Sequence, residues 1–166
     1  MQQPVFGIVG YKNSGKTTLL VRLVEHLVGK GVRVSTVKHA HHDVDMDQPG
    51  KDTFRHREAG ASEVMLATGR RWIMVHELRQ EPEPTLDDLL THLSPVDLVL
   101  VEGFKRFPHA KLEVHRQERG TPLLAAGDDT IMAVASDEPL DTPLPQFHLD
   151  DVATIASFIL TRTGIG

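Results

Sequence analysis

The chain has 166 residues, 40% of them hydrophobic and 25% charged, which is the composition of one soluble globular domain and excludes a disordered chain. Eighteen Lys and Arg against 23 Asp and Glu give a formal net charge of −5, which argues against nucleic-acid binding, and no apolar run is long enough to span a membrane. The absence of cysteine excludes disulfides, thiolate metal sites and cysteine nucleophiles.

The first half of the chain begins with a strand, a loop, a helix and a second strand. An apolar run at 5–9 predicts a buried strand, and helical spacing of apolar residues from 17 predicts a helix that ends near Gly29 and Gly31. Alternation at 32–37 predicts the second strand, parallel to the first. No targeting peptide is legible before residue 5, so we expect a cytoplasmic protein. A polar loop, a short helix and two strands are expected next, at 39–50, 51–59, 63–67 and 71–76.

The second half is expected to complete the sheet. Thr85 and Asp88 resemble a capping box that opens a helix to Leu93. The uniformly apolar segment 96–101 predicts a central strand that is covered on both faces. A final helix with an apolar stripe is expected, with Asp150 as its capping residue. Two further strands are predicted at 111–115 and 131–135, and an irregular segment at 138–146.

A phosphate-binding pattern lies between the first predicted strand and helix. Residues 10–17 read G-Y-K-N-S-G-K-T and fit G-x-x-x-x-G-K-[ST]. The glycines let backbone N–H groups approach a phosphate, the lysine reaches the outer phosphates, and the last hydroxyl ligates Mg²⁺. A glycine-rich turn without a ligand is the alternative. The predicted nucleotide-binding residues are Gly10, Asn13, Ser14, Gly15, Lys16, Thr17 and Thr18.

This motif sets the predicted fold class. We expect an α/β protein with the three-layer P-loop NTPase fold, in which helices flank a mostly parallel central sheet. One nucleotide-binding domain would span residues 1–166.

Acidic residues at strand ends are the candidate partners of this loop. A metal-binding acid is expected at the carboxyl end of a neighbouring strand, which is where Glu102 lies, so we assign Mg²⁺ to Thr17 and Glu102. Gly103 would allow close approach of the terminal phosphate, and Asp97, at the other end of the strand, is expected at the surface. Asp137 ends a late strand and would accept the N–H donors of guanine, although a simple turn explains it nearly as well.

Four of the ten histidines lie between 39 and 56, in a loop expected beside the phosphate site. One hypothesis is a nucleotide-sensing loop in which Lys38 or His39 contacts phosphate and Asp47 reaches Mg²⁺ through water. A second is a site for Zn²⁺ or Ni²⁺. A third is a polar loop without a ligand.

Several motifs in matching order resemble the MobB family, the adaptor proteins of molybdopterin-guanine dinucleotide biosynthesis. They are G-Y-K-N-S-G-K-T-T at 10–18, K-H-A-H-H-D-V-D-M-D-Q-P-G-K-D at 38–52, V-E-G-F-K at 101–105, K-L-E-V-H-R at 111–116 and A-V-A-S-D at 133–137. The resemblance implies a GTP-binding homodimer with at most slow hydrolysis and no assigned catalytic residue. It also implies a partner, the guanylyltransferase that joins GMP to a molybdopterin-type ligand, and by analogy Phe104 and Lys105 would report nucleotide state to it.

Two other functions stay open at this point. A small-molecule kinase would use the same loop with Asp47 or Glu102 as the base. A metallochaperone GTPase would bind its metal through His39, His41 and His42.

Overall fold

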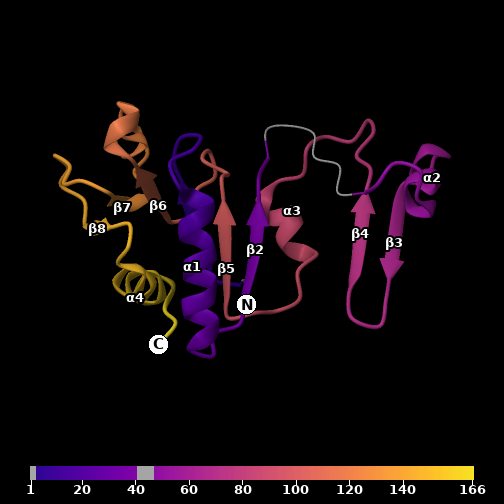
Figure 1. Ribbon diagram of the computed structural model, residues 1–166, viewed down its shortest axis with the longest axis horizontal. Coiled ribbons are helices and arrows are strands. Elements are labelled where there is room, and N and C mark those ends of the chain that lie inside the picture. The colour runs from indigo at the N-terminus through magenta and orange to yellow at the C-terminus, as the bar shows by residue number, and fades with distance from the viewer. Residues whose placement is uncertain (1–2, 41–46) are drawn as a thin grey trace. The chain divides into compact units, whose positions relative to one another are not determined.

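The structure is a computed structural model that describes residues 3–40 and 47–166 (Figure 1). The chain divides into two compact units, one formed by residues 1–39 and 90–166 and the other by residues 40–89. Within the described ranges, no helix has the length and apolar character that crossing a membrane requires. The expectation of a single domain over 1–166 stays a prediction.

The larger unit is built on a six-stranded sheet in the order β2-β5-β1-β6-β7-β8, and every neighbouring pair is parallel. All five residues of β5 are buried between β2 and β1, as its uniformly apolar sequence predicts. This sheet and its helices confirm the predicted fold class. The strands are β1 (Val5–Val9), β2 (Val34–Lys38), β5 (Leu98–Glu102), β6 (Lys111–His115), β7 (Ile131–Ser136) and β8 (Gln146–His148).

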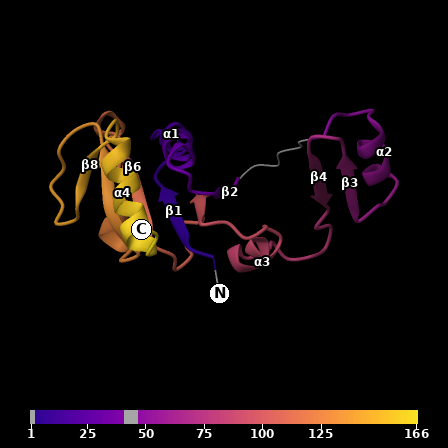
Figure 2. The same ribbon diagram turned by 90° about the horizontal axis from the view of Figure 1, so that it is seen from below.

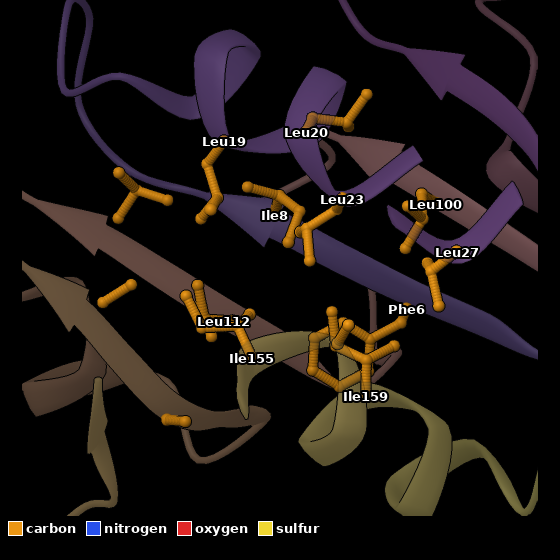
Figure 3. Packing of buried hydrophobic residues seen from close by; sticks show 14 of the residues in the cluster. Phe6, Ile8, Leu19, Leu20, Leu23, Leu27, Leu100, Leu112, Ile155 and Ile159 are labelled. Carbon is orange, nitrogen blue, oxygen red and sulfur yellow. The ribbon is translucent and has the colours of Figure 1, made fainter. Parts of the chain in front are cut away.

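Two helices, α1 (Lys16–Gly29) and α4 (Val152–Thr163), pack against each other on one face of this sheet (Figures 1 and 2). Leu23 of α1 and Ile155 of α4 are fully buried against Ile8 in the core that Figure 3 shows. Each such side chain contributes roughly 1.5–3 kcal/mol of hydrophobic stabilisation. This packing fixes the start of α1 beside the end of β1, where the phosphate loop connects them.

The opposite face of the sheet carries charged residues. Lys111 and Glu113 alternate with the core residue Leu112 along β6, so they point away from α1 and α4, and both are fully buried. The Glu113 carboxylate accepts hydrogen bonds of 2.9 Å from the N–H groups of Leu124 and Ala125. These residues begin the 3₁₀ turn η2 (Leu124–Gly127), which follows η1 (Gln117–Arg119). The buried carboxylate therefore anchors η2 to the sheet.

The smaller unit contains α2 (Asp52–Glu58) and the antiparallel hairpin of β3 (Glu63–Ala67) and β4 (Trp72–His76). Within this unit, the mostly buried Arg57 forms ion pairs with Asp47 at 3.3 Å and with Glu77 at 2.7 Å.

Helix α3 (Leu86–Thr91) begins at the predicted capping box. The Asp88 N–H donates to the Thr85 hydroxyl oxygen, and the Asp88 carboxylate accepts from the Thr85 N–H, which confirms the motif.

In the C-terminal region the expected helix cap is wrong and one strand was not foreseen. The capping residue of α4 is Asp151, whose carboxylate accepts the Thr154 N–H at 3.2 Å, whereas Asp150 forms an ion pair of 2.7 Å with Arg22. The segment expected to be irregular at 138–146 is irregular over 138–145, and the short edge strand β8, which begins at Gln146, was not predicted. Strand pairing with β7 forms β8, and three residues are too few for a periodic sequence signal.

Candidate functional site

The phosphate loop connects β1 to α1 in a conformation that requires glycine. Gly10 has φ +149°, and a Cβ at this position would overlap the carbonyl oxygen of Val114. Gly15 has φ +97° and is the N-terminal cap of α1, without a side-chain hydrogen bond to the helix. The first N–H groups of α1 therefore keep their capacity to bind an anion.

A cavity of about 430 Å³ lies against this loop. Lys16 projects beside it, and its ammonium group donates a hydrogen bond of 2.7 Å to the carbonyl oxygen of Tyr11. Burial lowers the pKa of the Lys16 ammonium, and the nearby Glu102 carboxylate opposes that fall. The lining residues are Lys12, Asn13, Gly15, Lys16, Thr17, Thr18, Lys38 and Glu102.

Glu102 is 8% exposed and is held from two sides. The Thr17 hydroxyl donates to its Oε1 at 2.9 Å, and the Lys38 ammonium lies 3.2 Å from the same oxygen. The two residues assigned to Mg²⁺ from the sequence thus lie in contact, next to the predicted phosphate ligand Lys38. Asp97, at the other end of β5, pairs with the exposed Arg33 at 2.7 Å, as expected for a surface residue.

The structure places His39 and Gly103 beside the cavity rather than in its lining. The His39 N–H donates to the carbonyl oxygen of Glu102 at 2.9 Å, and the His39 ring packs on the Phe104 ring at a tilt of 31° with a centroid distance of 4.7 Å. Gly103 has φ +92°, and a Cβ there would lie 3.1 Å from the His39 Cβ. Here the glycine permits close approach of the His39 backbone, a neighbour that sequence reasoning did not foresee.

Asp137 follows β7 and is engaged by donors of the chain itself. Its Oδ1 accepts the Gln117 N–H at 3.1 Å, and its Oδ2 lies 3.3 Å from Nη1 of Arg116. The Gln117 N–H and then the Arg116 guanidinium lower the pKa of the Asp137 carboxyl. Guanine recognition by Asp137 stays a prediction.

Asp47 lies in the smaller unit, and its carboxylate accepts hydrogen bonds from the Thr53 hydroxyl at 2.8 Å and the Gln48 N–H at 3.0 Å. With Arg57 also paired to it, this carboxylate stabilises the start of α2. Its predicted contact with Mg²⁺ is not tested by this geometry and stays a prediction.

His41 and His42 lie outside the described residues. Across 3–40 and 47–166, no group of three or more His, Asp or Glu side chains is arranged to hold a metal ion.

Sequence reasoning missed two basic residues near the phosphate loop. Lys12 lines the cavity but is not among the residues that the sequence predicts to bind nucleotide. Arg116 directly follows β6, which neighbours β1. The rule that selected Glu102, that ligands bind beyond the carboxyl ends of parallel strands, could also have selected Arg116.

Comparison with known proteins agrees with the motifs. A family model described as MobB, molybdopterin guanine dinucleotide synthesis protein B, matches residues 5–137. The molybdopterin-guanine dinucleotide biosynthesis adapter protein of Haemophilus influenzae is 42% identical over 161 residues, which cover 95% of this chain and 88% of that protein. The Escherichia coli protein of the same name is 38% identical over 160 residues, covering 95% and 91%.

Solved structures of MobB proteins are similar to this chain. A crystal structure of molybdopterin-guanine biosynthesis protein B superposes with a TM-score of 0.77 at 30% identity, covering 96% of this chain and 99% of the other. A MobB homologue from Bacillus stearothermophilus superposes with a TM-score of 0.72 at 30% identity, covering 99% and 100%. The similarity therefore extends over both units and is not confined to the phosphate loop.

Proposed function

This chain belongs to the MobB family of molybdopterin guanine dinucleotide synthesis proteins, and on that premise we propose that it is an adapter protein of this pathway that binds GTP with Mg²⁺. The observation that carries the nucleotide part of the proposal is the cavity between the phosphate loop and the end of β5. It brings the Lys16 ammonium, the start of α1 and the Glu102 carboxylate around one space.

The donor set suits Mg²⁺, which prefers oxygen ligands. The Thr17 hydroxyl and the Glu102 carboxylate supply two oxygens that are already 2.9 Å apart. In this proposal they hold the metal, directly or through its water, and the metal neutralises charge on the outer phosphates. Lys16 binds the same phosphates, and Lys38 lies close enough to contribute a second positive charge.

The adapter part of the proposal rests on the relatives, whose names describe adapter proteins. The partner is the guanylyltransferase that transfers GMP to a molybdopterin-type ligand, and the adapter works in the cytoplasm as a homodimer. Phe104 and Lys105 connect nucleotide to partner, since they lie two and three residues after Glu102 and Phe104 is packed on His39. Co-elution of the chain with the guanylyltransferase in the presence of GTP tests this partner.

Calorimetry with GTP and Mg²⁺ tests the nucleotide site. Lys16→Ala removes the cation beside the cavity and is expected to abolish GTP binding. Lys30→Ala is the matched control, because Lys30 caps the far end of α1 and is exposed. Unchanged GTP affinity of the Lys16 variant would show that the assignment of the loop is wrong. Competition by ATP measures base preference in the same experiment.

Turnover separates an adapter from a small-molecule kinase. We expect acceptor-free GTP hydrolysis slower than about one per minute, compared with median enzyme rates near 10 s⁻¹. Rapid phosphate transfer to a metabolite would contradict the adapter assignment.

A further inference from the structure

The phosphate loop lies between two strand ends of different chemistry. On one side of β1 is β5, which ends at the metal acid Glu102, and on the other side is β6, which is followed by Arg116. Under the proposed function, a metal held by Glu102 would neutralise charge on the outer phosphates of a nucleotide, so those phosphates belong on the β5 side. The nucleoside end then extends toward β6 and β7.

Arg116 lies against the loop at this second side. Its Nε and Nη2 atoms are 3.5 and 3.6 Å from the position that a Cβ on Gly15 would take. The guanidinium group therefore packs on the part of Gly15 that lacks a side chain. The Arg116 side chain is 37% exposed, so a ligand that leaves the phosphate cavity on this side can reach it.

Asp137 fixes the orientation of this guanidinium. One carboxylate oxygen of Asp137 pairs with Arg116, and the other accepts the Gln117 N–H, from the residue next along the chain. Register pairing of His115 with Ser136 brings the two strand ends level, which is why the pair can form. The Arg116 side chain is thus held by Asp137, the residue after β7, and packs against Gly15 of the phosphate loop.

We propose that Arg116 forms the nucleoside-binding end of the site, where its planar guanidinium stacks on the face of a purine base, and that Asp137 is a positioning residue which acts through Arg116. This inference rests on the proposed nucleotide binding and adds the contact that the base makes. Arginine suits the role because its planar charged group stacks on aromatic faces, which a lysine ammonium does not do.

Stacking predicts a pattern of affinities that edge recognition does not. A stacked guanidinium contacts every purine face in the same way, so it strengthens binding of GTP and of inosine triphosphate, which lacks the exocyclic amine of guanine. It contributes nothing to tripolyphosphate, which has no base. A carboxylate that read the guanine edge would instead favour GTP over inosine triphosphate.

Calorimetry with Mg²⁺ and each of these three ligands tests the proposal. For Arg116→Ala we expect affinity for both nucleotides to fall about tenfold, within the range of cation–π contacts, with tripolyphosphate affinity unchanged. Arg116→Lys should lose most of the same nucleotide affinity, because a lysine ammonium does not stack on the base. Arg22→Ala is the matched control, since Arg22 is 40% exposed, pairs with an aspartate and lies on α1, and it should bind as the wild type does.

Asp137→Asn tests the positioning role. A smaller, equal loss for GTP and inosine triphosphate supports it, whereas a loss confined to GTP with a gain for xanthosine triphosphate would show that Asp137 reads the base edge. Equal losses of nucleotide and tripolyphosphate affinity in Arg116→Ala, or no loss at all, would overturn the stacking role. A wild-type protein that binds none of the three ligands would refute the proposed function itself. Thermal melting of each variant confirms that the fold is retained.

Discussion

The partly buried imidazole of His109 should make the folded protein less stable at acidic pH. Its imidazole packs over β1 at Gly7, where a Cβ would overlap the ring, and within the described structure neither ring nitrogen has a hydrogen-bond partner. Burial, and to a smaller extent the nearby Lys111 ammonium, lowers the pKa of His109 from 6.5 to about 4, although the Asp128 carboxylate opposes the fall. The folded protein therefore holds this ring neutral at pH values where the unfolded chain protonates it.

The sign and size of the effect follow from linkage. Well above pH 6.5 the ring is neutral in the folded and the unfolded state, so its protonation does not affect the free energy of unfolding. As the pH falls from 6.5 toward 4, the unfolded state binds the proton first and stability is lost. One pKa unit corresponds to ~1.36 kcal/mol, so the full shift would correspond to ~3.4 kcal/mol. The ring is only partly buried, and allowing for solvent screening reduces this to about 1.5 kcal/mol. Roughly 1 kcal/mol of it should be lost between pH 7.5 and 5.0.

Urea denaturation of the wild type and His109→Phe at these two pH values measures that loss. Phenylalanine keeps the planar ring and removes the titration, so the variant should lose about 1 kcal/mol less than the wild type on acidification. The other nine histidines are common to both proteins and cancel in the comparison. Equal losses in the two proteins would refute the account of His109.

Three further predictions concern the loop, the second face of the sheet and the smaller unit. Gly10→Ala places a Cβ against the carbonyl oxygen of Val114 and should abolish GTP binding measured by calorimetry. Gly127→Ala is the control, because a Cβ there meets open space and GTP binding should persist. Normal GTP binding by Gly10→Ala would contradict the loop geometry. Glu113→Ala removes two hydrogen bonds to a buried charge and should lower the free energy of unfolding in urea by about 3 kcal/mol. A loss below about 1 kcal/mol would mean that η2 does not depend on this carboxylate. Arg57→Met removes the ion pair between Arg57 and Asp47, whose side chain is 12% exposed, and should lower the stability of the smaller unit by about 3 kcal/mol. We expect faster proteolysis within residues 40–89, and an unchanged cleavage rate would argue against this ion pair as the anchor of the unit.

The elements that sequence reasoning located well are those whose signal is local. The buried apolar run of β1 and the glycines and lysine of the phosphate loop are contiguous, so Val5–Val9 and the loop were predicted with their observed boundaries. Glu102 was predicted from its place at a strand end, and its contact with Thr17 across 85 residues agrees with that logic.

The features that were missed depend on pairing between distant segments. The contact of Arg116 with Asp137 requires the register of β6 and β7, which no local pattern encodes. Asp150 and Asp151 are equally good helix caps by residue type, and the ion pair with Arg22 on α1 engages Asp150 and leaves Asp151 as the cap. The pairing of Asp47 with Arg57 was likewise missed, because it depends on how α2 folds against the preceding loop, while the contact of Asp47 with Mg²⁺ stays a prediction.

The ion pair between Lys38 and Glu102 has a thermodynamic consequence for ligand order. A cation that coordinates Glu102 must compete with an ammonium group 3.2 Å away, so the site is poor at taking up a metal by itself. A polyphosphate changes this balance, because it offers Lys38 another anion and releases the carboxylate. Metal and nucleotide should therefore strengthen each other's binding by the same factor, as linkage requires. Under the proposed function, the protein would therefore respond to the metal–nucleotide complex rather than to the concentration of either component.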